Sequence, residues 1–267
     1  VPFSHAGGRQ ANFAYLDSGV LLASDTGARY YSFSGELYAE EVLSMENPVL
    51  SASNRSGVVY DAGGQSLFLF RGTQEVFDLT LEGDADLLTA QQSGFKGAVT
   101  VYDEDGSEVI QISLSSTFVV DAALSPDCRT VAVVTMDQEG GAFSTQVLFY
   151  PVDQEEPSAQ ASLEGITELD LDYEDGLLWV LGEDRLMAVP QDGSAPASYS
   201  FGRSYLKGCS LGGDGYALLL LGRYRAGSAS QALTIGPDGA VLASMDLSGQ
   251  VLDHSAAGNY CSLLTGD

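Results

Sequence analysis

The 267-residue chain has little of several residue types that mark particular classes of protein. It contains two lysines, Lys96 and Lys207, two histidines, three cysteines and one tryptophan. No stretch approaches the roughly 18 consecutive apolar residues that a membrane-spanning helix needs, and no secretory signal peptide is visible. The sequence therefore predicts no direct insertion of this chain into a membrane. Because the chain begins at Val1, we expect that targeting information preceded it.

The three cysteines, Cys128, Cys209 and Cys261, are odd in number and widely spaced. Without a C-x-x-C pair, neither a zinc site nor a redox-active dithiol is supported. We expect Cys128 in a turn, and Cys209 and Cys261 as small buried residues of inner strands.

Basic residues are also scarce: 11 Lys plus Arg stand against 37 Asp plus Glu, for a net charge of −26. Such a surface repels nucleic-acid phosphates and anionic lipid headgroups, so it disfavours both kinds of partner. The simplest interpretation is that the charge keeps the protein soluble. The alternative is attraction of cationic partners or divalent ions.

What is abundant points to an all-β fold. Apolar residues make up 45% of the chain, and there are 31 glycines, 13 tyrosines and 11 phenylalanines. This composition favours many short strands joined by turns.

Residues 118–163 have the pattern of one complete four-stranded antiparallel unit. Apolar residues alternate over 118–124, which predicts a strand with two different faces. The turn residues Ser125-Pro126-Asp127 follow, then the buried run TVAVVTM and the aromatic strand QVLFY. A polar strand at 159–163 closes the unit. The gradient from apolar first strand to polar last strand is typical of a β-propeller blade.

Two earlier segments, residues 12–43 and 48–81, repeat this order. Matching turn glycines are separated by 38, 37 and 37 residues: Gly19 and Gly57, Gly27 and Gly64, Gly35 and Gly72. A regular offset of this size is the signature of a repeat architecture, and tight turns with positive φ favour glycine.

Further units begin near residues 86, 118, 167, 206 and 251. The third unit has an expected inner strand at 86–91 but is about ten residues short; either it is degenerate or a loop is absent from the sequence, and we favour the second. The last unit ends after two strands. We therefore predict a single domain over 1–267: a β-propeller of seven blades of about four antiparallel strands, with one blade short and the last incomplete. Residues 1–5 could supply one outer strand that closes the ring; the alternative is that chain beyond the C-terminus completes the seventh blade or adds an eighth.

The S-P-D turn followed by TVAVV, and the G-x-D-G turn at 212–215 followed by YALLL, resemble the repeats of WD40-like and quinoprotein-like β-propellers. The WD40 Gly-His and Trp-Asp signatures and the tryptophan-docking motif are absent, since Trp179 is the only tryptophan, so no cofactor is expected. The chain is also similar to uncharacterised propellers of anaerobic gut-type bacteria that follow a membrane anchor, which implies a location at the bacterial surface.

Three groups of residues are candidates for chemistry. His5 and His254 lie far apart in sequence and could meet where the ring closes, but no other metal or triad partner converges on them. The stretch Asp103-Glu104-Asp105-Gly106 resembles the start of a calcium loop, but Ile112 occupies the position of the required glutamate, so a hairpin turn is favoured. Asp170, Asp172 and Glu174 alternate in one strand and therefore share a face. If that face lined a channel, it could bind a cation, or two of its carboxylates could act in glycoside hydrolysis. The alternative is an ordinary solvated strand face.

No G-x-S-x-G elbow, Walker A sequence or G-x-G-x-x-G motif occurs. Aromatic residues of the third strands are expected to pack between blades rather than bind sugars: Tyr30, Tyr31, Phe33, Phe68, Phe70, Phe149 and Tyr150.

We thus assign no catalytic, cofactor-binding or metal-binding residue. We expect a non-catalytic binding or scaffold propeller on a bacterial surface, outside the cytoplasm and anchored by a segment beyond this sequence. The expected partner is a protein or carbohydrate, and the chain itself a monomer. The alternative is an enzyme of the lyase, glycosidase or lactonase type acting in the central funnel.

Overall fold

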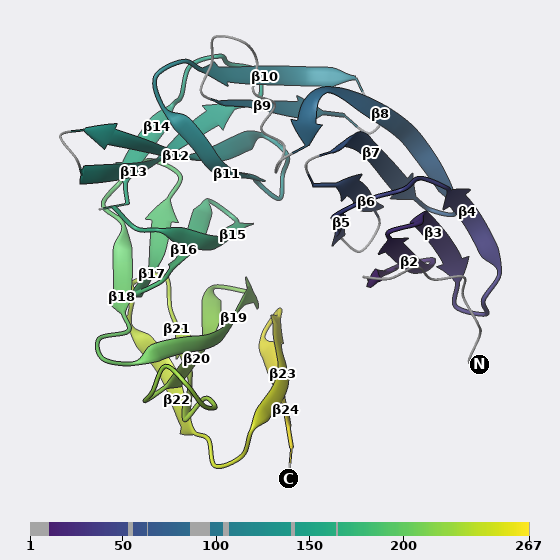
Figure 1. Cartoon of the computed structure of the whole chain (residues 1–267). Helices are drawn as coiled ribbons and strands as arrows, with labels where there is room; N and C mark the ends of the chain where they lie inside the picture. The colour runs from purple at the N-terminus through teal and green to yellow at the C-terminus, as the bar shows by residue number, and fades with distance from the viewer. Residues whose placement is uncertain are drawn as a thin grey trace. The chain divides into compact units, whose positions relative to one another are not determined.

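The structure is a computed structural model that describes residues 11–52, 56–62, 64–85, 97–103, 107–139, 142–163 and 165–266. Every regular element within these ranges is a β-strand, and they contain no helix (Figure 1). The all-β prediction is therefore confirmed. The chain divides into two compact units, Val1–Ser116 and Thr117–Asp267. Each is described by itself, and the single domain over 1–267 stays a prediction.

In its described residues, the first unit contains two four-stranded antiparallel sheets and a two-stranded one, each made of strands consecutive in sequence. Its strands are β1 (Asn12–Leu16), β2 (Gly19–Ser24), β3 (Gly27–Ser32), β4 (Leu37–Glu41), β5 (Pro48–Ala52), β6 (Ser56–Asp61), β7 (Gly64–Arg71), β8 (Gln74–Ala85), β9 (Gly97–Tyr102) and β10 (Glu108–Leu114). The strand predicted at 86–91 and the closing strand at 1–5 lie outside the described residues.

The first two sheets of this unit pack face to face. Tyr30 and Phe70 are fully buried and share one core with Leu21 and Val59. At Gly57 the sheets approach so closely that a Cβ would collide with the Leu21 side chain, which explains why glycine is needed there. Burial of this apolar surface supplies most of the unit's stabilisation.

The second unit contains three four-stranded antiparallel sheets and a final two-stranded one in the described residues. Its strands are β11 (Phe118–Leu124), β12 (Thr130–Glu139), β13 (Ala142–Pro151), β14 (Ala159–Ser162), β15 (Glu168–Glu174), β16 (Leu177–Gly182), β17 (Arg185–Pro190), β18 (Ala197–Ser200), β19 (Tyr205–Gly213), β20 (Tyr216–Gly222), β21 (Gln231–Ile235), β22 (Val241–Asp246), β23 (Val251–Ala257) and β24 (Tyr260–Thr265).

Neighbouring sheets of the second unit are held together mainly by side-chain packing. Phe149 of β13 meets Tyr173 of β15 edge to face, with ring centroids 6.1 Å apart. Trp179, only 1% exposed, belongs to the next core, with Leu219 and Ile235. The first strands β11, β15, β19 and β23 contact one another in turn.

These four first strands share a β-bulge at the same depth. The bulges lie between Val119 and Asp121, Glu168 and Asp170, Leu206 and Gly208, and Val251 and Asp253. In three strands the residue after the bulge is an aspartate, whose Oδ1 accepts a hydrogen bond of 2.7–3.0 Å from the next backbone N–H. In β19 that position is Gly208. The bulge is thus a repeated feature that re-aims side chains.

The turns after these first strands repeat as well. Gly176, Gly215 and Gly258 all have positive φ, at 73°, 69° and 55°. The corresponding residue after β11 is Cys128, with φ 57°. The expected turn position of Cys128 is confirmed, although its backbone conformation favours glycine.

Some local predictions need correction. Cys209 is partly buried as expected, but Cys261 is exposed, because β24 has only β23 as a neighbour within the described residues. Of the third-strand aromatics, Phe33 is 55% exposed and the other six are buried. The β12–β13 hairpin is longer than predicted, since its ladder runs on to Glu139 and Ala142.

Candidate functional site

The predicted acidic face exists on β15. Asp170, Asp172 and Glu174 alternate without a further bulge, while Leu171 and Tyr173 on the other face pack into the core towards β11–β14. The carboxylate of Glu174 accepts a hydrogen bond from the backbone N–H of Gly215, at 3.2 Å from Oε2. The acidic face is therefore turned towards β19 and the turn that follows it.

Burial disfavours ionisation along this face. It raises the pKa of Glu168 to about 7, and the carboxylates of Asp121 and Asp170 add to the rise. Burial also raises the pKa values of Asp121, Asp170 and Asp172, while hydrogen bonds from neighbouring backbone N–H groups partly oppose it. These four carboxyls thus form a crowded, incompletely solvated group.

The candidate calcium loop begins at Asp103. Asp103 Oδ1 accepts a hydrogen bond of 2.8 Å from the Ser107 backbone in the hairpin between β9 and β10, as the hairpin interpretation predicts. His5 and residues 104–106 lie outside the described ranges. Within those ranges, no group of three or more His, Cys, Asp or Glu side chains has an arrangement that could hold a metal ion.

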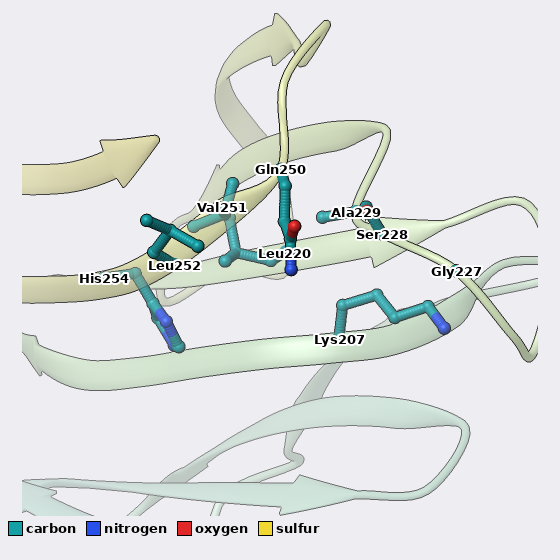
Figure 2. A pocket seen from close by; sticks show the side chains of 9 residues that line it. All are labelled: Lys207, Leu220, Gly227, Ser228, Ala229, Gln250, Val251, Leu252 and His254. Atoms are coloured by element: carbon teal, nitrogen blue, oxygen red, sulfur yellow. The ribbon is translucent and has the colours of Figure 1, made fainter. Parts of the chain in front are cut away.

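A pocket of about 410 Å³ lies between β19–β20 and the start of β23, and Figure 2 shows its lining. We call it the Lys207–His254 pocket. Leu220, Val251 and Leu252 supply apolar wall, and the Gln250 side chain points inward. The rest of the lining is Gly227, Ser228 and Ala229, from the connection between β20 and β21.

The two basic side chains of this pocket are held by backbone carbonyls. Lys207 Nζ donates to the carbonyl oxygen of Arg225 at 2.7 Å. His254 Nε2 lies 3.0 Å from the carbonyl oxygen of Cys209, and since a carbonyl only accepts, Nε2 carries the proton. Nδ1 of the neutral imidazole is then the unprotonated nitrogen.

Two glycines make room for these side chains. A Cβ at position 222 would lie 2.5 Å from Lys207 Cε, and one at position 208 would lie 2.6 Å from His254 Cε1. Both distances are shorter than any normal contact, so glycine at each position allows the basic side chain to lie flat on the backbone.

The segment that contains Lys207 is basic, unlike the chain as a whole. Residues 203–225 contain four basic residues and one acid, Asp214. The basic residues, which we call the basic surface, are Arg203, Lys207, Arg223 and Arg225. Since Tyr205 pairs with Gly222, the start of β19 and the end of β20 meet at the same edge of the sheet.

Sequence reasoning missed this pocket. From the sequence alone, Lys207 is one of two lysines and His254 is an isolated histidine. Two signals in the sequence could have found it: the local reversal of charge over 203–225, and the replacement of the repeated aspartate by Gly208. The packing of His254 on Gly208 has no sequence signal.

The described residues form no helix long and apolar enough to cross a membrane.

Solved structures with a similar fold are β-propellers. The C-terminal WD40 domain of Sif2 aligns with a TM-score of 0.61 and 12% identity, covering 89% of this chain and 72% of that one. The β-propeller domain of Cps50 (Swd1) from Myceliophteria thermophila gives 0.58 and 8%, covering 95% and 91%. BamB from Moraxella catarrhalis gives 0.55 and 10%, covering 94% and 78%. At these identities the likeness shows the fold alone, and it confirms the predicted β-propeller; the number of blades stays a prediction.

Sequence comparison gives one family. No curated protein matches the chain. Residues 4–176 match the family described as "Family of unknown function (DUF5711)".

Proposed function

Because the chain belongs to the Family of unknown function (DUF5711) and folds as a β-propeller, we propose that it is a non-catalytic binding or scaffold module. The observation that carries the proposal is the connection between β20 and β21. It is eight residues long, 223–230, whereas β2–β3 and β16–β17 are each joined by two. Binding residues are commonly presented on such loops by a rigid sheet.

The composition of this loop favours recognition. Tyr224 is 75% exposed and stands between Arg223 and Arg225, which are also exposed. Tyrosine and arginine are the residue types enriched where proteins bind partners, because they combine a large contact area with directional hydrogen bonding.

The proposal includes a location outside the cytoplasm on a bacterial surface, a protein or carbohydrate ligand, and a monomeric chain held by an anchor beyond this sequence. Its support is the resemblance to anchored bacterial propellers and the fold shared with BamB from Moraxella catarrhalis. The net charge of −26 disfavours nucleic acid as the ligand.

A photo-crosslinking amino acid in place of Tyr224, in cells that produce the protein, tests the proposal. We expect a discrete cross-linked species that is identified by mass spectrometry and lost when Arg223 and Arg225 are changed to glutamate. Phe143 of β13, 61% exposed, is the matched control position. Cross-linking equal at both positions, or absent at 224, would contradict the proposal.

Glu168 favours a second candidate, the funnel-site enzyme of lyase, glycosidase or lactonase type. Glu168, whose pKa is raised to about 7 by burial and by the carboxylates of Asp121 and Asp170, has the raised pKa of the general acid in glycoside hydrolysis. Turnover of aryl glycosides that disappears in Glu168→Gln would establish the enzyme. Residual activity unaffected by that substitution would exclude Glu168 as its acid.

A further inference from the structure

Sheet β19–β22 departs from the neighbouring sheets at three places that meet around one pocket. The bulge residue of β19 is Lys207, whereas the bulge residues of the other three first strands are apolar: Val120, Leu169 and Leu252. At the next position, the repeated aspartate is replaced by Gly208. The third departure is the long connection at 223–230, which carries Arg223 and Arg225.

From these departures we propose that the Lys207–His254 pocket binds a carboxylate carried on a short aliphatic body. The inference rests on the proposed binding function and names the ligand chemistry of the same site. The carboxylate comes either from a free small acid or from the C-terminal residue of a peptide.

The charges favour an anion. Compared with the neighbouring sheets, Gly208 lacks the carboxylate of the repeated aspartate, and Lys207 places an ammonium group where they have an apolar side chain. An ammonium group has three donors, and Lys207 Nζ uses one on the Arg225 carbonyl, which leaves two for a ligand. The nearby carboxylate of Asp253 is engaged by the backbone N–H of His254 at 2.8 Å.

His254 adds a second polar group to the same pocket. Its Nε2–H is committed to Cys209 O, so its position against Gly208 is fixed.

The size of the anion follows from the rest of the molecule. A long polyanion that covered the basic surface would also run onto a chain with net charge −26. A compact anion can instead be held at the pocket itself, where Lys207 and His254 are part of the lining. The pocket volume of about 410 Å³ is within the range of small-molecule sites.

The lining favours an aliphatic body over a bare inorganic ion. Leu220, Val251 and Leu252 form apolar wall, while Gln250 and Ser228 offer a few polar groups. A ligand of this kind buries its methylene groups against the apolar wall. Its carboxylate accepts a charge-assisted hydrogen bond from Lys207, which is stronger than one between neutral groups.

The test uses the two histidines as probes in the intact chain. With ¹³C-labelled histidine at constant neutral pH, the His254 signal is assigned from its loss in His254→Gln. The protein is titrated with hexanoate, N-acetyl-leucine, N-acetyl-leucinamide and inorganic phosphate. We expect the His254 signal to shift saturably with at least one of the two carboxylates, and not with the amide or phosphate.

Variants separate the pocket from general charge. Lys207→Met keeps the aliphatic stem on Gly222 and should weaken carboxylate binding at least tenfold, whereas Lys207→Arg should retain most of it. Arg129→Met removes one positive charge from an exposed turn in the same unit and should change nothing. If Lys207→Met does not fold, the ligand series on the parent protein still decides the question.

Each result has a definite meaning. A shift with hexanoate alone identifies a free acid as the source, and a shift with N-acetyl-leucine alone identifies a peptide C-terminus. No saturable shift with either acid up to about 10 mM, corresponding to roughly 3 kcal/mol, overturns the inference. An equal response to phosphate or to the amide overturns it as well. Cross-links at position 224 in the absence of carboxylate binding would leave the proposed function standing.

Discussion

The imidazole of His254 on β23 lies against the Cα of Gly208 on β19 and is held by a 3.0 Å contact between Nε2 and the carbonyl oxygen of Cys209. This relationship joins the last two sheets of the second unit. It requires glycine at position 208. The corresponding residue in the other three first strands of this unit is an aspartate: Asp121, Asp170 and Asp253.

Gly208→Ala should therefore destabilise the protein by about 1–3 kcal/mol, because the new Cβ would lie 2.6 Å from His254 Cε1 and must displace the ring. Chemical unfolding measures the loss. His254→Ala in the same chain should restore part of it by removing the collision. A double variant less stable than either single variant would show that the ring is not what opposes the Cβ.

Cys128→Gly should stabilise the protein by about 0.5–1 kcal/mol. Cys128 has φ 57°, a left-handed conformation that costs a side-chain-bearing residue about 1 kcal/mol, and glycine occupies the corresponding turn position in the next three sheets. Cys128→Ala keeps that cost and removes the thiol, so it should bring no gain. Thermal unfolding of the three proteins distinguishes them, and equal stability of the Ala and Gly variants would refute the explanation.

The strand order and most strand bounds could be predicted from the sequence, because alternation and turn glycines are local signals. The run at 130–136 and the glycines at 19, 27 and 35 fall where the structure has strands and turns. The bulges could not be predicted, since an extra residue in a strand such as Val120 does not disturb its apolar character. The pocket forms because β19, the 223–230 connection and β23 lie next to one another in the folded chain. No local sequence pattern predicts that these three segments are neighbours.

The stability of the protein should depend on pH through Glu168. Its ordinary pKa is 4.5 and burial raises it to about 7 in the folded protein. The folded state therefore binds the proton more tightly, so this stabilising contribution is complete below pH 4.5 and is lost as pH rises through 7.

Glu168→Gln should consequently be more stable than the parent at pH 8, by about 1 kcal/mol for a partly buried group, and no more stable at pH 4.5. Urea unfolding at the two pH values measures the difference. Glu155→Gln, at an exposed glutamate, is the control. The same stability gain at both pH values would show that the substitution acts through packing instead.

The thiols should react at very different rates. Burial raises the pKa of Cys209 to about 12, and the carboxylate of Asp170 adds to the rise, so almost no reactive thiolate forms at pH 8. Cys128 is exposed and should be alkylated by iodoacetamide under those conditions. Peptide mass spectrometry measures the alkylation of Cys209 and Cys128, and denaturant should abolish the difference between their rates. Rapid modification of Cys209 in the folded protein would contradict its placement between β15 and β23.

The shared depth of the bulges in β11, β15, β19 and β23 has a practical consequence. Deleting one residue within any of these strands would shift all later side chains to the opposite face. Exchanging a whole first-and-second-strand segment, such as 168–182 for 205–222, would carry each bulge together with its own turn glycine, Gly176 or Gly215. The second unit is therefore suited to modular grafting, in which a binding surface is moved between repeats as one piece.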